Sequence, residues 1–479
     1  MLELMIDLRR DRDVPYYVQL YQHIRDEIKY GHLPAGTRLP AIRQLSEHLH
    51  ISRNTVEAAY MQLTAEGYTE SRARSGLYVV ELEQDYLLSE QQAGAEQMKA
   101  QVSAPDSWNR PDTASEIRID FRNGSTDMRY FPYSVWNRIS LETMQADTKA
   151  LTREGNPQGE YGLRYQLASY LRYSRGVKCR PEQIVLGVGI QQLTTLLCQL
   201  IGGDHREVAM EEPGYNGVKS AFVHQNYRIT PIVLQEDGID VEAVKRSEAK
   251  LVFVTPSHQF PLGMIMSVNK RLKLLQWATE QQALIIEDDY DSEFRYQGCL
   301  IPALQGLDKT DSVVYMGTFS KALLYGISMS YMVLPERFVP IFRERVCELE
   351  PTVSTIHTHT LERFMAEGHW EKHLRKMKKV YQKKHALLVE CIYRYFGKKA
   401  SVIGHRSGLH VVLEVHSDYT EEELIKLAAN QGVRVYGTSR FWMNSEHCTA
   451  TRLLIGFGGL TEQEIEEGVR LLYEGWFKT

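Results

Sequence analysis

Residues 14–82 constrain the fold most, because three helical patterns and one hairpin pattern follow each other in a short stretch. Apolar residues recur at the i, i+3, i+4, i+7 spacing over residues 14–32, which predicts a first helix. Pro40 fits the first turn of a second, shorter helix. Ser52 fits the N-cap of a third helix that ends at Gly67. Two short helices joined this tightly are typical of a helix-turn-helix unit.

A hairpin pattern follows the third helix. Residues 68–80 form two extended runs around the small and basic residues 72–76, which predicts a wing. Residues 1–82 hold 10 Lys and Arg against 11 Asp and Glu, so any DNA contact depends on where single cations lie. A recognition helix presents its first turn to the major groove. The residues expected to contact DNA are Arg43, Ser52, Arg53, Asn54, Thr55, Arg72 and Arg74. The pattern alone also allows a structural domain in which Ser52 only caps its helix.

The rest of the chain shows a different pattern. Residues 83–116 are polar and lack sustained periodicity, which predicts a linker. Over residues 117–345, short apolar runs alternate with helical patterns, as in a mostly parallel sheet flanked by helices. Residues 346–479 then predict an interdomain helix and a smaller α+β domain. The predicted fold class is an α+β winged helix-turn-helix at residues 14–82, joined to a large α/β body with a small C-terminal α+β domain.

Composition restricts the compartment and the chemistry. The 479 residues contain no apolar run of the roughly 20 residues that a membrane span needs, and the first residues do not resemble a signal peptide. The six cysteines lie far apart without a CxxC pair, so neither a disulfide framework nor a zinc site is expected. We therefore expect a cytoplasmic protein with no membrane partner and no metal site.

Three short motifs in the body could belong to a binding site, but each one alone is weak evidence for it. Lys321 follows a predicted strand in the run Thr-Phe-Ser-Lys, where a lone lysine is usually a surface residue. Asp288 and Tyr290 end another apolar run 33 residues earlier, and an acidic loop would give the same letters. Gly189 opens a helical pattern after a strand, a place where backbone N–H groups can hold a phosphate. The order of the three motifs along the chain makes them stronger evidence for a binding site together than any one of them is alone.

Two resemblances account for nearly the whole chain. Residues 38–80 resemble the winged helix of the GntR superfamily. The body resembles fold-type I aminotransferases, and the two halves together resemble the MocR/GabR family of transcription regulators. This resemblance implies pyridoxal 5'-phosphate as cofactor, a double-stranded DNA operator, a small amino acid or amine as effector, and a homodimer.

The resemblance also implies a role for each motif residue. Lys321 would form the Schiff base, Asp288 would protonate the pyridine nitrogen, and Tyr290 would lie near the ring hydroxyl. Tyr215 would stack on the ring, and Arg440 would clamp a ligand carboxylate. The phosphate would be held by Gly189, Ile190, Gln191, Thr318 and Ser320.

The chain departs from the family pattern at the phosphate. Ser328 stands seven residues after Lys321, where relatives usually carry an arginine, and Tyr325 replaces the usual proline. Ile190 stands where a hydroxyl is common. A lost charged hydrogen bond corresponds to roughly 1.5–3 kcal/mol, so affinity for the cofactor is expected to be lower than in relatives.

Three functions fit these residues. The leading one is a regulator that senses an amino acid or amine through an aldimine on Lys321, with at most weak transaminase activity. The second is an active aminotransferase with an appended DNA-binding domain. The third is a regulator whose body no longer binds pyridoxal phosphate.

Overall fold

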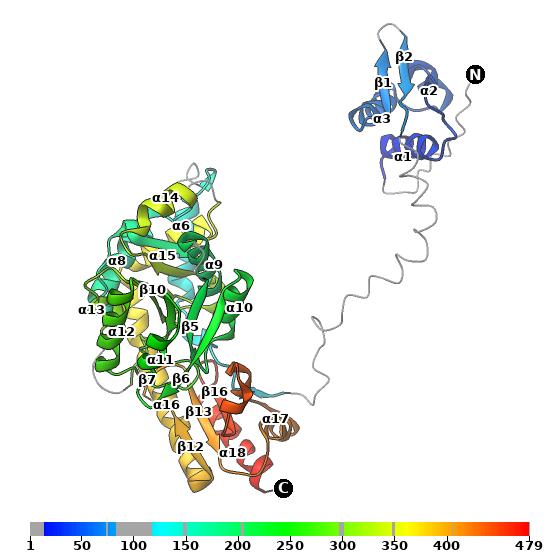
Figure 1. Ribbon diagram of the computed structural model, residues 1–479. Helices are drawn as coiled ribbons and strands as arrows, with labels where there is room; N and C mark the ends of the chain where they lie inside the picture. Colours follow the sequence, from blue (N-terminus) through cyan, green and yellow to red (C-terminus); the bar gives the residue numbers. More distant parts are fainter. Residues whose placement is uncertain are drawn as a thin grey trace. The chain divides into compact units, whose positions relative to one another are not determined.

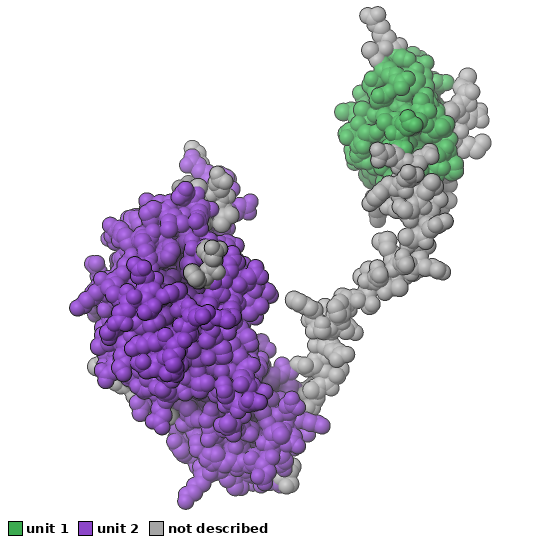
Figure 2. Space-filling view, viewed as in Figure 1, with its two compact units in different colours: residues 1–113 green, residues 114–479 purple. Residues whose placement is uncertain are grey.

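The computed structural model describes residues 14–72, 75–82, 117–146, 151–202, 206–296, 301–346, 350–404 and 406–478. The chain divides into two compact units, residues 1–113 and 114–479, which Figure 2 shows in different colours. Each unit has its own buried apolar core. The predicted linker at residues 83–116 lies outside the described residues. Within the described residues, no helix is both long enough and apolar enough to cross a bilayer.

The N-terminal unit consists of three helices and a hairpin. Its elements are α1 (Tyr16–Lys29), α2 (Ile42–His48), α3 (Arg53–Ala65), β1 (Thr69–Arg72) and β2 (Gly76–Val79). The strands pair antiparallel, with Thr69 opposite Val79 and Arg72 opposite Gly76. The three helices and the hairpin enclose one core, as the apolar spacing predicts.

Local signals explain the helix boundaries in this unit. Val56, Ala59, Tyr60 and Leu63 form the buried face of α3. The Ser52 hydroxyl accepts a hydrogen bond from the Thr55 backbone N–H at 3.2 Å and caps the helix. The prediction that Pro40 lies in the first turn of the second helix is wrong. Ala41 has extended φ and ψ, so α2 begins only at Ile42.

The body is built on an eight-stranded sheet in the order β4-β11-β10-β9-β8-β5-β6-β7. Figure 1 labels β5, β6, β7 and β10 of this sheet. The strands are β4 (Ile184–Gly187), β11 (Ser330–Val333), β10 (Val313–Thr318), β9 (Leu284–Asp289), β8 (Leu251–Val254), β5 (Glu207–Glu212), β6 (Arg228–Gln235) and β7 (Gly238–Ile239). From β10 to β6 neighbouring strands are parallel, whereas β11 runs antiparallel to both β10 and β4. The central strands are buried along their length, as expected of a sheet covered on both faces.

Helices cover this sheet and lead to the C-terminal lobe. They are α6 (Tyr133–Ala146), α8 (Tyr161–Arg175), α9 (Ile190–Ile201), α10 (Asn216–His224), α11 (Val241–Arg246), α12 (Val268–Gln281), α13 (Leu304–Leu307), α14 (Phe338–Val346) and α15 (Thr355–Ala366). The 28-residue helix α16 (His369–Phe396) then runs to the C-terminal lobe. Four short 3-10 turns, η1 (Met128–Tyr130), η2 (Pro181–Gln183), η3 (Tyr325–Ile327) and η4 (Gly397–Lys399), also belong to the body.

The C-terminal lobe combines an antiparallel sheet with two helices. Its elements are β12 (Ala400–Ile403), β13 (His410–Val415), α17 (Glu421–Asn430), β14 (Val433–Arg434), β15 (Tyr436–Gly437), η5 (Ser439–Phe441), η6 (Ser445–His447), β16 (Arg452–Gly456) and α18 (Glu462–Phe477). Strand β3 (Ile119–Asp120) pairs in parallel with β14, although the sequence pattern places residue 117 onward in the large domain. The chain therefore passes through the C-terminal lobe before it builds the large sheet.

Candidate cofactor and ligand site

A cavity of about 700 Å³ lies where the central parallel strands end. Strands β9 and β10 are neighbours, with Met316 opposite Asp288, so the end of β9 and the turn after β10 lie side by side. The cavity is lined by every body residue predicted to bind cofactor or ligand: Gly189, Ile190, Gln191, Tyr215, Asp288, Tyr290, Thr318, Ser320, Lys321 and Arg440. The structure thus brings these residues together from distant parts of the sequence.

Lys321 lies in the turn after β10, half-buried in this cavity. Loss of hydration lowers the pKa of its amine, while the nearby carboxylates of Asp291 and Asp288 act in the opposite direction. A Cβ atom on Gly124 would collide with Lys321 Nζ, so a side chain at that position would displace the amine. A lowered pKa increases the fraction of neutral amine, which is the nucleophilic form.

Asp288 is the buried acid of the site. Successive side chains of a strand alternate, so Asp289 faces the other way, where Arg175 Nε donates to its carboxylate at 2.7 Å. Asp288 Oδ1 finds no hydrogen-bond partner among the described residues. Burial, together with the negative charges of Asp289 and Asp291, raises the pKa of Asp288 well above its usual range. An unpaired buried acid is costly, which favours a cationic or N–H donor from a bound molecule.

Aromatic residues line the cavity near Asp288. The Tyr290 hydroxyl lies 3.0 Å from His258 Nδ1, and both carboxylate oxygens of Asp291 lie 3.0 Å from that nitrogen. Tyr215 meets Phe260 edge to face, with 5.7 Å between ring centroids. These contacts hold Tyr290 and Tyr215 at the cavity wall.

His258, Asp291 and His410 form a buried cluster whose possible metal-ligand atoms lie within 4.8 Å of one another. His410 Nε2 lies 3.1 Å from the carbonyl oxygen of Pro261. His258 Nε2 and His410 Nδ1 have no hydrogen-bond partner among the described residues. Burial and the neighbouring His258 lower the pKa of His410 to about 3, so this ring is neutral at physiological pH. The expectation of no metal site rests on cysteine spacing, which carries no information on this cluster.

The phosphate end of the cavity is formed by the start of α9 and the turn after β10. Gly189 has φ +122° and precedes the first turn of α9. The Thr318 hydroxyl already accepts from the Ser320 backbone N–H at 3.2 Å and from the Ser330 hydroxyl at 2.9 Å. Ser328 is exposed and has φ +45°, in the left-handed region. The cup therefore offers backbone N–H groups and hydroxyls, and neither Ile190 nor Ser328 supplies a charge.

Arg440 lies in η5, with its guanidinium over the rings of Phe441 at 4.7 Å and Tyr436 at 5.9 Å. Its loop is tied to the end of β5. Glu212 accepts from the backbone N–H groups of Met443 at 2.8 Å and Asn444 at 2.6 Å. Asn216 Nδ2 donates to the Arg440 carbonyl oxygen at 2.7 Å. These bonds fix the Arg440 loop while leaving its guanidinium without an ion pair among the described residues.

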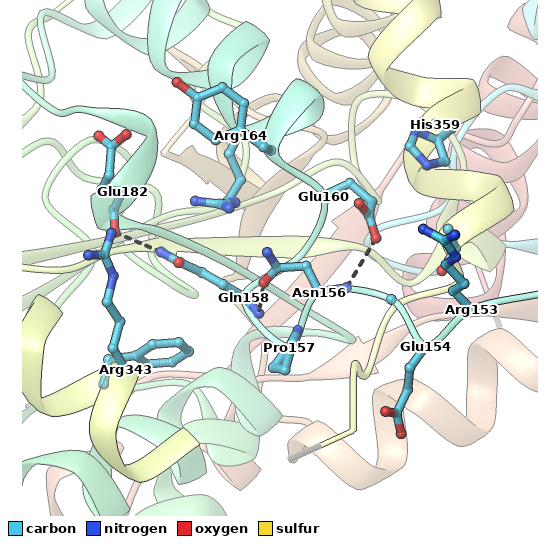
Figure 3. A pocket seen from close by; sticks show the side chains of 14 residues that line it. Arg153, Glu154, Asn156, Pro157, Gln158, Glu160, Arg164, Glu182, Arg343 and His359 are labelled. Atoms are coloured by element: carbon cyan, nitrogen blue, oxygen red, sulfur yellow. Dashed lines mark hydrogen bonds between the residues drawn. The ribbon is translucent and has the colours of Figure 1, made fainter. Parts of the chain in front are cut away.

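A second cavity of about 700 Å³ lies beside α8, α14 and α15 (Figure 3). Its wall includes Arg153, Arg164 and Arg343 together with Glu154, Glu160 and Glu182, so it mixes positive and negative side chains. Several polar groups bond within the wall, as when Gln158 Nε2 donates to the Glu182 carbonyl oxygen at 2.7 Å. None of the motif residues lines this cavity.

The predicted DNA contacts lie on one small unit. Arg53 and Asn54 are exposed in the first turn of α3. The hydroxyls of Ser52 and Thr55 lie 2.8 Å apart and bond to each other. Arg43 forms an ion pair with Glu47 at 3.0 Å, and Arg72 forms one with Glu70 at 2.7 Å. Arg74 lies outside the described residues.

Sequence reasoning assigned no individual role to several residues in or beside the body site. They are Arg122 and Gly124 after β3, the buried Glu211, and the His258–Asp291 pair. Thr255 donates to Glu211 Oε2 from its hydroxyl at 2.6 Å, and burial raises the pKa of Glu211 to about 7. Gly124, which follows a short strand, is a local sequence signal for this part of the site. The other contacts join residues that are far apart in sequence, so spacing rules do not reveal them.

The site matches the needs of pyridoxal phosphate. Lys321 offers an amine, and Asp288 offers a buried acid whose Oδ1 has no partner in the described part of the chain and could face a ring nitrogen. The start of α9 offers N–H groups to a phosphate. The fold and the cavity define a pyridoxal phosphate-binding body of the aminotransferase type, preceded by a winged helix-turn-helix unit.

Comparison with known proteins defines the class further. Residues 124–472 match the family "Aminotransferase class I and II", and residues 16–79 match "Bacterial regulatory proteins, gntR family". The body is similar to an archaeal alanine:glyoxylate aminotransferase, with TM-score 0.69, 21% identity, and coverage of 83% of this chain and 100% of that one. It is also similar to the α-aminoadipate aminotransferase LysN from Thermus thermophilus, with TM-score 0.66, 23% identity, and coverage of 76% and 94%. These structural likenesses show the fold.

Two relatives span almost the whole chain. The HTH-type transcriptional regulator YdeL of Bacillus subtilis (strain 168) is 38% identical, over 98% of both chains. The probable rhizopine catabolism regulatory protein MocR of Rhizobium meliloti is 34% identical, over 98% of this chain and 95% of its own. The chain belongs to the MocR/GabR family of transcription regulators, which confirms the resemblance seen in the sequence.

Proposed function

We propose that this chain is a homodimeric DNA-binding regulator that holds pyridoxal phosphate on Lys321 and changes its DNA affinity when a small amino acid or amine enters the same cavity. The single observation that carries the proposal is that Lys321 lines the same cavity as Asp288, whose Oδ1 has no hydrogen-bond partner among the described residues. The cofactor supplies an aldehyde that captures amines and a ring that absorbs visible light.

The chain's own residues would divide the remaining work. Arg440, without an ion pair among the described residues, would bind a carboxylate of the ligand in a bidentate fork. Asp288 would hold a proton at the ring nitrogen, and Tyr215 and Phe260 would cover the cofactor from bulk water. Glu212 would couple Arg440 to β5, because it binds the backbone of the same loop.

DNA binding would use the N-terminal unit. Arg53 and Asn54, exposed at the start of α3, would meet base edges, while Arg43, Arg72 and Arg74 would meet phosphates. Ser52 and Thr55 are bonded to each other, so Ser52 would act mainly as the helix cap and Thr55 would support it. A dimer would present two such helices to paired half-sites.

The experiment is a DNA-binding titration of the full chain on a duplex selected from a random library. With pyridoxal phosphate present, an amine that shifts the cofactor's visible absorption should change DNA affinity about 5- to 150-fold. Lys321→Ala should still bind DNA but lose that response, and Lys309→Ala, an exposed lysine, should respond as the unaltered chain does. DNA affinity that is the same with and without every absorbing ligand would contradict the proposal.

An active aminotransferase is the second candidate, since Lys321, Asp288 and Arg440 would also serve such an enzyme. The weak phosphate end argues against repeated turnover, because the cofactor must stay bound between half-reactions. Sustained release of a keto acid over many cycles would instead favour the aminotransferase over the regulator.

A further inference from the structure

Two arginines face the same cavity. Arg122, which follows β3, and Arg440, in η5, both line it together with Lys321. Both also contact one side chain of the C-terminal lobe, Tyr436. Arg122 Nε donates to the Tyr436 hydroxyl at 3.3 Å, and the Arg440 guanidinium lies 5.9 Å from the Tyr436 ring centroid. Both cations therefore lie against one tyrosine.

The charge of these arginines is only partly balanced. The nearest carboxylate to Arg122 is Asp120, whose Oδ2 lies 3.6 Å from Nε, and Asp120 Oδ1 already accepts from the Tyr436 hydroxyl at 2.9 Å. The terminal amino groups of Arg122 make no hydrogen bond to a described residue, and its side chain is 62% exposed. Arg440 has no carboxylate within 4.0 Å among the described residues. Asp288 is the only acid among the cavity's lining residues.

The hydrogen-bond and ion-pair partners of Arg122 favour the ligand side of the cavity, although Tyr325 of η3 also interacts with its charge. Its partners Asp120 and Tyr436 both join the C-terminal lobe, since β3 pairs with β14 and β15 pairs with β16. The cup is built from α9 and from the turn after β10, in the large sheet. Two residues beyond Arg122, Gly124 lies against Lys321 Nζ. A ligand amine at Lys321 would thus lie beside the segment that carries Arg122, in the cavity that Arg440 also lines.

We propose that the effector carries two anionic groups, as an α-amino dicarboxylic acid does, with one carboxylate on Arg440 and the other on Arg122. This inference rests on the proposed function. Phe441 and Leu454, which also line the cavity, would pack against the aliphatic spacer between the carboxylates. A neutral analogue would leave one of the two guanidinium groups without its partner, which lowers its affinity.

The test is a titration of the full chain, loaded with pyridoxal phosphate and followed by visible absorption. The probes are L-aspartate, L-glutamate and L-2-aminoadipate, each compared with the isostere whose side chain ends in an amide: L-asparagine, L-glutamine or L-homoglutamine. At least one dicarboxylate should bind 10-fold or more tightly than its isostere. Arg122→Gln should bring that ratio close to 1, because it weakens binding of the dicarboxylate more than binding of the isostere. Arg118→Gln, an exposed arginine on the same segment, is the matched control and should keep the ratio.

Three outcomes would overturn the inference in distinguishable ways. Isosteres that bind as well as all three dicarboxylates would reject the second anion site while leaving amino acid sensing intact. If Arg122→Gln weakens binding of pyridoxal phosphate itself and keeps the ratio, Arg122 serves the cofactor phosphate instead. If no probe of either kind alters the absorption of a chain that carries the cofactor on Lys321, both the inference and the sensing of α-amino acids fail.

Discussion

The two ends of the cofactor cavity differ in what holds them. At the ring end, specific partners hold buried charged groups: Arg175 forms an ion pair with Asp289. The neighbouring Asp288 keeps an Oδ1 that has no hydrogen-bond partner among the described residues. At the phosphate end, the described lining residues supply backbone groups and hydroxyls, and Ser328 stands without charge. We therefore expect covalent and ring contacts, rather than contacts to the phosphate, to dominate cofactor binding. Such a site suits a sensor whose cofactor can exchange.

Restoring a cation to the phosphate end should give the largest effect. Ser328→Arg is expected to tighten binding of pyridoxal phosphate about 10- to 100-fold, because charged hydrogen bonds to phosphate are strong. Ser328 already carries a Cβ at φ +45°, so the exchange adds little backbone strain. Equilibrium dialysis of the cofactor measures the change. Ser328→Gln, which adds length without charge, should leave affinity near its starting value; equal gains in both variants would show that charge is not what the cup lacks.

The buried acid Glu211, near the ring end, should make the stability of the body depend on pH. Burial raises the pKa of Glu211 to about 7 from 4.5, so the folded chain binds this proton more tightly than the unfolded chain does. The contribution of Glu211 to stability therefore falls as pH rises from about 4.5 to about 7 and then levels off. Glu211→Gln, which retains an oxygen acceptor for Thr255, should be more stable than the unaltered chain by roughly 1–3 kcal/mol at about pH 8.

At about pH 4.5 this advantage of Glu211→Gln should be absent, because the carboxyl is then protonated in the folded chain. Thermal unfolding of the body at several pH values measures the difference, and Glu422→Gln, at an exposed position, is the control. A stability difference that does not vary with pH would show that Glu211 keeps an ordinary pKa.

Asp288→Asn should separate stability from cofactor binding. The chain without cofactor should become more stable, because an amide replaces a buried acid whose Oδ1 has no partner among the described residues. Affinity for pyridoxal phosphate should fall about 10-fold, since a neutral amide cannot pair with a protonated ring nitrogen. Unfolding midpoints without cofactor and dialysis with it measure the two effects. The exposed Asp418→Asn should change neither; a loss of stability in Asp288→Asn would place this carboxylate in the structural core instead.

The winged unit could be predicted almost completely from sequence, because its signals are local. The third helix and its cap Ser52 follow from helical spacing and a capping side chain, and in the structure Val56, Ala59, Tyr60 and Leu63 form the buried face of that helix. Pro40 is the exception, because the sequence pattern does not distinguish a proline just before a helix from one in its first turn. Predictions that depend on neighbours in sequence therefore succeed here.

The body site could be predicted only through the resemblance. Lys321 and Asp288 are unremarkable until the parallel pairing of β9 with β10 brings them together. The contacts of Glu212 with the loop after Arg440, and of Arg122 with Tyr436, join segments that no spacing rule connects. Such contacts arise from the packing of the two lobes, which one-dimensional periodicity does not encode.

The central claim is that the ring end holds pyridoxal phosphate on Lys321, and borohydride reduction tests it most directly. The full chain, saturated with the cofactor, is reduced, digested and examined by peptide mass, alongside Lys321→Ala. The account predicts one pyridoxyl group on the peptide that contains Lys321 and none in the variant. No adduct at saturating cofactor, or an adduct on another lysine, would contradict it.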